Sequence, residues 1–419
     1  MAKLTKLYAR EILDSRATPT IEVIAILDTG EYGVASIPSG SSTGSYEAVE
    51  LRDNDPNRYL GKGVLKAVKN VNQEIAAALV GRDPQSVLQL DDQLIRLDGT
   101  PTKSRLGANA VLGVSIAVTK ALAAASKKPL YRYIAELAQN TQPLTIPSPV
   151  FNMINGGKHG AGNLDFQEFH VIPGRTGSYA QTLETGAEIY QTIKKILARR
   201  GAIHSVGDEG GFAPNLFTNL DALEVLSESI TECHHKPSVD VELGLDVASN
   251  TFFKDGKYTI KDRSSPMDAP EFIDYLRDLN SQYPLRLLED PLSEDDWKNW
   301  SSLTAELSRT TTIVGDDLIV TNKDKVAKAI AEKACTGVII KPNQIGTISE
   351  TIAVVKQARA AGWKINVSHR SGETNDTFIA DFAVGVGADY AKFGAPARGE
   401  RVAKYNRFLS IEVELQQPA

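Results

Sequence analysis

The second half of the chain contains a series of short apolar segments that end in ionisable side chains. These segments are VELGLD, ending at Asp246; LRLLED, at Glu289 and Asp290; TTIVGDD, at Asp316 and Asp317; GVIIK, at Lys341; WKINVSHR, at His369 and Arg370; and YAKFG, which carries Lys392. Their β-branched content predicts buried strands, and helical segments such as ALEVLSESITECH and ISETIAVVKQARAAG alternate with them. From Glu289 onward the charged ends recur roughly every 25 residues, which fits one strand and one helix. In a closed (β/α) barrel all such ends face one mouth, where these barrels place their chemistry.

Each charged end has a plainer explanation when it is considered alone. A carboxylate at the start of a βα loop often caps the next helix. Lys341 could lay its stem along the barrel rim and keep its ammonium group in water. The same coincidence would have to occur at six successive strands, so a shared site at the mouth is the favoured interpretation.

Composition restricts the class of protein. A chain of 419 residues exceeds one average domain, which favours two domains. The net charge of -6 and the lack of a dense Lys/Arg run argue against nucleic acid as a partner. Cys233 and Cys335 are too few for a disulfide framework and suit a reducing compartment. We find neither a signal-peptide pattern nor an apolar run approaching bilayer length, so we expect a cytoplasmic protein without membrane insertion.

The first part of the chain has a different pattern. Residues 21–38 contain β-rich runs around an Asp-Thr-Gly turn signal and predict a hairpin. Helical spacing follows in three stretches that end at Gly81, at Gly99 and before Pro129. Strands followed by helices predict a small α+β unit, and the proline-rich TQPLTIPSP resembles a domain connection. We therefore expect an α+β domain over residues 1–140 and a catalytic barrel over residues 141–419.

Three of the strand-end acids predict a metal site. Asp246, Glu289 and Asp316 follow consecutive strands and offer only oxygen ligands, with no cysteine or histidine among them. Hard oxygen ligands favour magnesium over zinc. Carboxylates that lie close together also repel one another, and a divalent cation is their natural counter-charge.

Lys341, Arg370 and Lys392 would bring positive charge to the same mouth. Such cations suit an anionic substrate, and the planar fork of arginine matches a phosphate or carboxylate. A metal beside a partly desolvated lysine indicates abstraction of a proton next to a carboxylate, because the metal would stabilise the enediolate that forms.

The sequence closely resembles the enolase (phosphopyruvate hydratase) family along nearly its whole length. The matching motifs are AREILDSR at Ala9, PSGSSTGSYEAVELRD at Pro38, LGANAVLGVS at Leu106, NGGKHGAGNLDFQEF at Asn155, GDEGGFAPN at Gly207, LLEDP at Leu287, GDDLIVTN at Gly315, KPNQIGT at Lys341, SHRSGET at Ser368 and RVAKYN at Arg401. The resemblance implies a small α+β domain on a modified (β/α)8 TIM-type barrel whose second strand runs antiparallel. It also implies a hydro-lyase of glycolysis and gluconeogenesis that reversibly dehydrates 2-phosphoglycerate to phosphoenolpyruvate.

By that resemblance, Lys341 is the base that removes the C2 proton and Glu209 is the acid that protonates the leaving C3 hydroxyl, with Glu168 beside it. A free lysine pKa of about 10.4 is too high for a base at neutral pH, so we expect burial and magnesium to lower it. We also expect Glu168 and Glu209 to share a proton, because two adjacent carboxyls do not both ionise easily. Taken without the family, Glu209 could be a turn residue and Glu168 an exposed strand position.

The resemblance assigns the remaining contacts as well. It gives Asp246, Glu289 and Asp316 to a first magnesium and Ser42 to a second, which arrives with the phosphorylated substrate. Substrate contacts are expected from His159, Gln167, His369, Arg370, Ser371 and Lys392. Alternation of side chains does not by itself choose between Glu289 and Asp290, or between Asp316 and Asp317. SGSSTGS would be a mobile lid with glycines at 40 and 44, although such a composition is also typical of a plain linker.

Some positions depart from the family pattern. Ala17 and Thr18 stand where the family usually has glycine and asparagine, so the geometry of that turn is in question. Pro342 directly after the proposed base is less usual, and Gly399 replaces a common serine or threonine.

Two other functions remain open at this point. Another enolase-superfamily dehydratase or racemase would share the barrel and the metal acids, but it would not need the phosphate-binding SHRSGET. A surface role in plasminogen capture would use lysines, whereas this chain ends in QQPA. The family further implies a homodimer or octamer, and a surface or secreted pool beside the cytoplasmic one.

Overall fold

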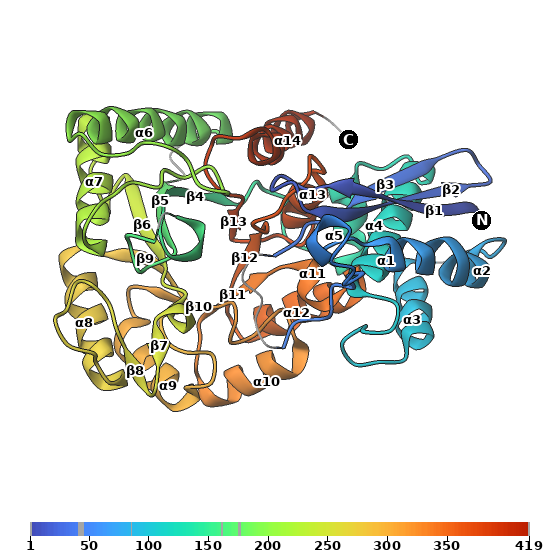
Figure 1. The fold of residues 1–419 in the computed structure, drawn as a ribbon. Coiled ribbons are helices and arrows are strands. Elements are labelled where there is room, and N and C mark those ends of the chain that lie inside the picture. Colours follow the sequence, from blue (N-terminus) through green and yellow to red (C-terminus); the bar gives the residue numbers. More distant parts are fainter. Residues whose placement is uncertain (1, 41–45, 85, 161, 175–176, 418–419) are drawn as a thin grey trace.

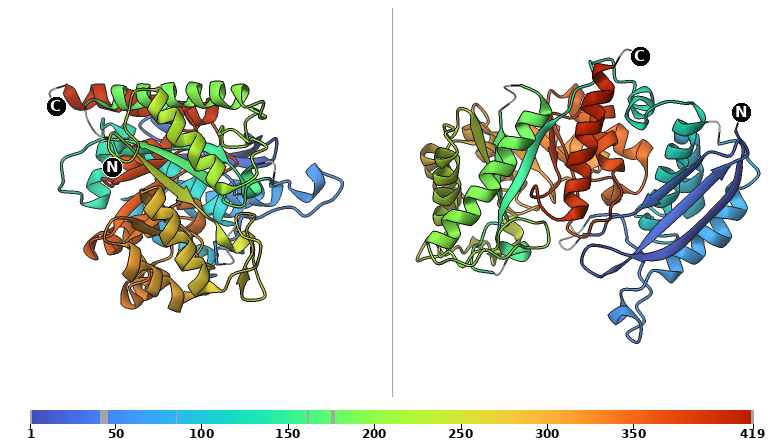
Figure 2. Two further views of the ribbon diagram at one scale, coloured as in Figure 1. Left: turned by 90° about the vertical axis from the view of Figure 1, so that its left-hand side faces the viewer. Right: turned by 90° about the horizontal axis from the view of Figure 1, so that it is seen from above.

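The fold comes from a computed structural model, which describes residues 2–40, 46–84, 86–160, 162–174 and 177–417. A small sheet with its helices lies to one side of a larger barrel, and a view from above shows the same separation (Figures 1 and 2). The predicted combination of a smaller α+β unit and a modified (β/α)8 barrel is confirmed. The predicted boundary between residues 140 and 141 stays a prediction.

The amino-terminal unit is an antiparallel sheet covered by helices. Its strands are β1 (Leu4–Leu13), β2 (Pro19–Leu27) and β3 (Tyr32–Ser36). Its helices are α1 (Leu65–Asn70), α2 (Ala76–Leu79), α3 (Val87–Asp98), α4 (Ala108–Ala125) and α5 (Leu130–Ala138), with the π-helix η2 (Val71–Ile75) joining α1 to α2. The β2-β3 hairpin confirms the turn predicted at Asp-Thr-Gly, whereas β1 and α5 were not predicted.

Helix α4 is the centre of the amino-terminal core. It packs on the sheet closely enough that a β-carbon on Gly33 would lie 2.0 Å from the Ala117 carbonyl oxygen. By length and composition it could cross a membrane, contrary to our expectation that no such run exists. Because 78% of that window is buried inside the protein, its apolar character is explained by packing.

The barrel closes from eight strands. They are β4 (Ser148–Asn155), β5 (Glu168–Pro173), β6 (Val241–Asp246), β9 (Leu285–Glu289), β10 (Thr312–Gly315), β11 (Gly337–Ile340), β12 (Lys364–Ser368) and β13 (Tyr390–Lys392). Their order around the ring is β10-β11-β12-β13-β4-β5-β6-β9. Strand β5 pairs antiparallel with both β4 and β6, and the other neighbouring pairs are parallel. The antiparallel second strand implied by the family is therefore present.

Helices surround the barrel. They are α6 (Tyr179–Arg199), α7 (Asn219–Glu232), α8 (Ala269–Gln282), α9 (Trp297–Leu307), α10 (Lys323–Glu332), α11 (Pro342–Ile345), α12 (Ile348–Ala360), α13 (Phe378–Gly385) and α14 (Gly399–Gln416). A small hairpin of β7 (Phe253–Lys254) and β8 (Lys257–Tyr258) follows β6. This insertion explains why the interval from Asp246 to Glu289 is longer than those that follow it.

The unusual positions are accommodated locally. Ala17 adopts φ 56°, a left-handed conformation that costs a side chain about 1 kcal/mol or more relative to glycine. The turn still forms, because the Asp14 carboxylate accepts hydrogen bonds from the amides of Arg16 and Thr18. Pro342 occupies the first turn of α11, where the missing N–H costs little.

The two units meet at the amino terminus of α12. The Ser349 amide donates a 2.8 Å hydrogen bond to the Asp91 carboxylate of α3, and the Ile348 amide donates to Ser115 of α4 at 3.2 Å. Burial raises the pKa of Asp91 to about 6. A carboxylate from one unit thus satisfies an otherwise unpaired amide of the other.

The pKa of Asp91 predicts a pH dependence of stability. Its folded pKa of about 6 exceeds the ordinary aspartate pKa of 3.8, so the folded state binds more protons than the unfolded state between these pH values. The contribution of Asp91 to the free energy of unfolding is therefore fully present below about pH 4 and is lost as the pH rises through about 6. The total loss is about 3 kcal/mol. Urea unfolding of Asp91→Asn across this range should lack that loss. Asp92→Asn, a neighbouring exposed acid paired with Arg96, should match the wild type, and parallel profiles for wild type and Asp91→Asn would contradict the assignment.

Candidate active site

The barrel interior has an apolar floor. It is formed by Val150, Ile172, Leu287, Val314, Ile339 and Tyr390. Side chains alternate along a strand, so the residue two positions nearer the mouth points the same way. These inward-facing residues include Glu289, Asp316, Lys341 and Lys392. The floor residues therefore show that Glu289, and not Asp290, continues the inward-facing row of its strand, and that Asp316, and not Asp317, does so on the next strand. Alternation in the sequence alone left this choice open.

Asp290 shapes the turn after β9 and also lines the acidic cavity at the mouth. Its two carboxylate oxygens accept hydrogen bonds of 2.8 Å from the amides of Asp316 and Asp317. Burial and these two neighbouring acids raise the pKa of Asp290 well above its usual range. The residue therefore fixes the backbone that presents Asp316.

Lys392 reaches across the barrel. Its ammonium nitrogen lies 2.9 Å from Glu289, 3.2 Å from Asp246 and 3.2 Å from Glu168. Strand β13 is the fourth strand from β9 in either direction round the barrel, so the two strands lie opposite each other. The contact between Lys392 and Glu289 therefore spans the mouth. Although burial acts to lower the pKa of Lys392, the carboxylates raise it well above its usual range. Lys392 is therefore a fixed positive charge.

Lys341 pairs with Asp316. The ammonium group donates to Asp316 Oδ2, and Gln344 donates to Asp316 Oδ1 at 3.0 Å. Burial acts to lower the pKa of Lys341, but the Asp316 and Glu289 carboxylates oppose it, and the net shift of that pKa is upward. The expected lowering by burial is thus present but is opposed by the pairing with Asp316, and the expected effect of magnesium on this pKa stays a prediction.

Glu168 and Glu209 lie around His159 on the other side of the mouth. The His159 Nδ1 atom is 3.3 Å from Glu168 and 3.5 Å from Glu209. Burial and Glu168 act to raise the pKa of Glu209, but His159 and His369 bring it to about 2. Burial likewise acts to raise the pKa of Glu168, but Lys392 and two histidines hold it well below its usual range.

The pKa values of both acids are thus lowered, contrary to our expectation that the two carboxyls share a proton. Burial acts to lower the pKa of His159, but the two glutamates raise it. This shift favours a protonated His159 imidazole, which lies within reach of both carboxylates.

Glu209 comes from a loop and not from a strand end. Its backbone carbonyl accepts from the Ala395 amide at 3.0 Å, just after β13. Nearby, the Phe212 amide donates to the Met153 carbonyl of β4 at 2.9 Å. The side chain accepts from Asn152 at 3.1 Å. The loop is thus fastened to β4 and β13, next to β5, which carries Glu168.

His369 has a defined tautomer. An Arg401 guanidinium N–H donates to His369 Nδ1 at 2.6 Å, so that nitrogen accepts and Nε2 carries the hydrogen. The Nε2 atom lies 3.3 Å from Glu209. Burial lowers the pKa of His369, and Arg401 adds to the shift. A neutral His369 therefore directs an N–H toward Glu209.

Arg370 and Ser371 follow β12 at the edge of the mouth. The Arg370 guanidinium forms a two-point contact with Glu47, at 2.9 and 3.2 Å, and donates to Asn343 at 3.1 Å. The Ser371 hydroxyl lies 3.1 Å from His159 Nε2. Both residues are buried, so an anion that reached them would meet preorganised donors.

Lys341 and Glu168 stand on opposite walls. Strands β11 and β5 are four steps apart in either direction round the ring. Lys392 contacts Glu168 on one wall and reaches Asp246 and Glu289 as well. A small substrate at the mouth would thus meet an amine on one side and the glutamate-histidine cluster on the other.

The acids at the mouth can hold a divalent cation. A cavity of about 110 Å³ is lined by Gln167, Asp246, Asp290, Asp316 and Asp317, among others. The Gln167 side-chain oxygen has no hydrogen-bond partner among the described residues. Burial together with Asp246 raises the pKa of Glu289 well above its usual range, and burial together with Asp316 raises that of Asp317 to about 7. This crowding of carboxylates fits a bound cation.

The geometry differs in part from the predicted ligand set. Two trios of potential ligands lie with their atoms within 4.8 Å of one another: His159, Glu168 and Glu209, and Asp290, Asp316 and Asp317. The predicted trio of Asp246, Glu289 and Asp316 is not among the compact groups found in the described residues. Lys392 joins Asp246 to Glu289, while Lys341 binds Asp316. Ser42 lies outside the described residues.

A divalent cation should therefore stabilise the folded protein, and magnesium is the cation to test. A cation that binds only the native acids raises the melting temperature, and here we expect a rise of several degrees at millimolar magnesium. Asp316→Asn should lose most of that rise, measured by thermal unfolding with and without chelator. Glu242→Gln, at the far end of the barrel, should keep it. Equal rises in the two variants would contradict this location of the site.

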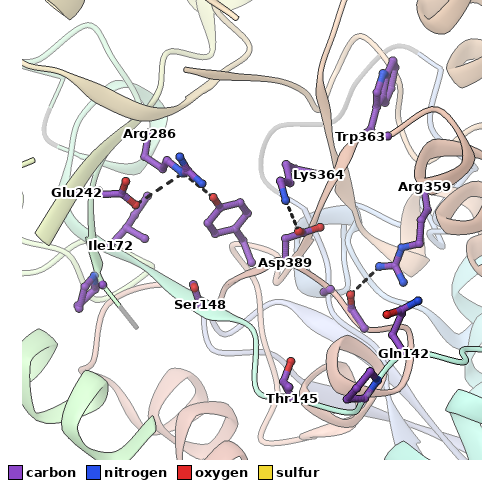
Figure 3. Close-up of a pocket in the computed structure, with 17 residues that line it drawn as sticks. Gln142, Thr145, Ser148, Ile172, Glu242, Arg286, Arg359, Trp363, Lys364 and Asp389 are labelled. Atoms are coloured by element: carbon purple, nitrogen blue, oxygen red, sulfur yellow. Dashed lines mark hydrogen bonds and ion pairs between the residues drawn. The ribbon is translucent and has the colours of Figure 1, made fainter. Parts of the chain in front are cut away.

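A second cavity, of about 660 Å³, lies at the opposite end of the barrel (Figure 3). It is lined by the residues that begin β4 and β12, Ser148 and Lys364. Lys364 pairs with Asp389 at 2.8 Å, and Arg286 donates to the Tyr390 hydroxyl at 2.8 Å (Figure 3). Its charges are engaged with one another, whereas the mouth concentrates acids around a few cations.

Several residues of the site were not predicted. Glu47, Asn152, Gln344 and Arg401 each contact a predicted residue. Glu47 and Gln344 belong to YEAVELRD and KPNQIGT, but polar residues of these types occur on any surface. The signal that singles them out is burial, which appears only in the fold.

Comparison with protein-family models gives two matches that together cover nearly the whole chain. Residues 4–134 match the family described as "Enolase, N-terminal domain". Residues 143–419 match the family described as "Enolase, C-terminal TIM barrel domain".

Proposed function

The chain belongs to the enolase family, and from this premise we propose that it reversibly dehydrates 2-phosphoglycerate to phosphoenolpyruvate. The observation that carries the proposal is the placement of Lys341 and the Glu168–His159–Glu209 cluster on opposite walls of one mouth. Removal of a proton from one carbon and of hydroxide from the next requires a base and an acid at two separate points. The mouth offers both.

Lys341 would act as the base toward C2. It must be neutral to accept a proton, and Arg370 and Lys392 already act to lower its pKa. A divalent cation bound at the acids would supply positive charge beside the substrate carboxylate and stabilise the negative charge that develops there. Binding of Asp316 to that cation would also weaken its pairing with Lys341, which favours the neutral amine.

The acid side would work through Glu209. The proton held on His159 is within reach of the Glu209 carboxylate, 3.5 Å away, and can pass through it to the leaving hydroxyl at C3. The neutral His369 N–H holds the other Glu209 oxygen in place. Glu168, fixed by His170 at 2.8 Å, orients His159 from the other side.

The substrate anions would be held at the rim. Arg370 and Ser371 suit a phosphate, and Lys392 and Gln167 suit the substrate carboxylate and hydroxyl groups. Enolase-superfamily enzymes that act on unphosphorylated acids would have no use for the arginine-serine pair. We further propose a homodimer or octamer, cytoplasmic work in glycolysis and gluconeogenesis, and a surface or secreted pool.

Turnover tests the proposed function directly. Purified protein with magnesium and 2-phosphoglycerate should produce ultraviolet absorption from the conjugated enol product, and a chelator should stop it. An unphosphorylated sugar acid, tested in parallel, should give no product. Turnover of the sugar acid alone would favour another superfamily dehydratase, and absence of any turnover in a folded protein would refute the assignment.

A further inference from the structure

The two-point contact of Arg370 is already used by a carboxylate. Glu47 places one oxygen 2.9 Å from Arg370 Nη1 and the other 3.2 Å from Nη2. Both side chains are nearly inaccessible, at 3% exposed for Arg370 and 8% for Glu47. The guanidinium is thus paired in the fork geometry that a phosphate would also use.

The position of Glu47 is built into the backbone. The amide of the next residue, Ala48, donates to the Gln344 carbonyl at 2.8 Å, and the amide of Val49 donates to the Thr102 carbonyl at 2.8 Å. Gln344 also reaches Glu47 with its own side chain, at 3.4 Å. Backbone bonds on the residues that follow therefore aim this carboxylate into the mouth.

Arg370 is confined on its other sides as well. A β-carbon on Gly40 would lie 2.0 Å from Arg370 Nη2, so the backbone there approaches the guanidinium closely. Asn343 accepts from Nη1 at 3.1 Å. With the guanidinium held in this way, an anion gains its two-point contact most readily by taking the place of the Glu47 carboxylate.

We propose that Glu47 is a positioning residue of the anion site, which holds Arg370 in place when no anion is bound and competes with a phosphate group for the same two N–H donors. The identity of the anion as a substrate phosphate rests on the proposed function. The competition itself rests only on the contacts of Glu47 with Arg370. Glu47 therefore sets how tightly the mouth binds phosphate.

Glu50 offers a matched control. It lies on the same segment and is an acid within the same arginine cluster, but its carboxylate bonds to Arg52 and to the Ser39 hydroxyl. Glu50→Gln removes a similar negative charge without freeing the Arg370 fork. The difference between the Glu47→Gln and Glu50→Gln variants thus isolates competition from general electrostatics.

Binding of inorganic phosphate, measured by isothermal titration in one magnesium-containing buffer, tests the proposal. Glu47→Gln keeps an oxygen acceptor for Arg370 but removes the competing charge, so phosphate should bind about tenfold tighter or more. Glu50→Gln should change the affinity by less than about threefold, because the Glu50 carboxylate is paired with Arg52 and Ser39 and does not occupy the two N–H donors of Arg370. Unchanged or weaker binding in Glu47→Gln, relative to Glu50→Gln, would overturn the proposal.

A second variant, Glu47→Ala, tests the competition between Glu47 and phosphate independently of Glu47→Gln. In Glu47→Ala the vacated position should accept free acetate, which would then compete with phosphate. Added acetate should weaken phosphate binding in this variant more than in the wild type, with chloride at equal ionic strength as the control. Equal effects of acetate on both proteins would contradict the competition.

These titrations do not depend on turnover. If Glu47→Gln tightens phosphate binding but the wild type fails to convert 2-phosphoglycerate, the role of Glu47 at the anion site is supported and the proposed function is refuted. If the wild type converts 2-phosphoglycerate but Glu47→Gln does not bind phosphate more tightly, the proposed function is supported and the role of Glu47 is refuted.

Discussion

Lys341→Ala should lower the turnover of 2-phosphoglycerate by about 10⁴-fold, because a positioned general base contributes up to roughly this factor. The same variant should lose exchange of the substrate C2 proton with solvent deuterium, measured by proton NMR in D₂O. Both losses have one cause, since no other amine pairs with Asp316 among the described contacts. Removing the amine takes away the group that would accept the C2 proton.

Lys364→Ala is the matched control for this result. That lysine begins β12 at the other end of the barrel, where it pairs with Asp389. It should keep both turnover and exchange. A Lys341→Ala protein that still exchanged the C2 proton at a wild-type rate would exclude Lys341 as the base.

Glu209→Gln should separate the two halves of the reaction. Glutamine keeps an acceptor for Asn152, 3.1 Å away, but it cannot relay a proton from His159 to the leaving hydroxyl. Dehydration should fall by about 10³-fold, within the range for a lost general acid. Exchange of the C2 proton should persist, because Lys341 on the opposite wall is untouched.

The control for Glu209→Gln is Glu242→Gln, an acid at the far end of the barrel. Both activities should survive there. If Glu209→Gln lost exchange and dehydration in equal measure, Glu209 would be acting in proton abstraction or in substrate binding, and the division of roles would be wrong.

The strand ends were predictable because two simple signals coincide in them. A buried strand needs an apolar, β-branched run, and a charge at its end is conspicuous against that background. Asp246, Glu289, Lys341 and Lys392 could therefore be placed at one mouth without a structure. The choice between Glu289 and Asp290 needed the floor of the barrel, because only the residues below show which face points inward.

Other features depend on contacts between distant segments. Glu209 comes from a loop without strand periodicity, and only its bonds to β4 and β13 bring it to the site. The pairing of Lys341 with Asp316 reverses the shift expected for its pKa, and the histidines around Glu209 do the same for that acid. Such electrostatic effects are set by neighbours in space, which the order of residues does not reveal.

The stereochemistry of elimination tests most directly whether Lys341 and the Glu168–His159–Glu209 cluster act on the substrate from opposite sides. With 2-phosphoglycerate carrying deuterium at one of the two C3 hydrogen positions, the labelled product can be identified as one geometric isomer by NMR. A base on β11 and an acid cluster beside β5 require the proton and the hydroxyl to leave from opposite faces, so each labelled substrate should give only the isomer of anti elimination. Formation of the syn isomer would show that base and acid act from the same side, contrary to this account.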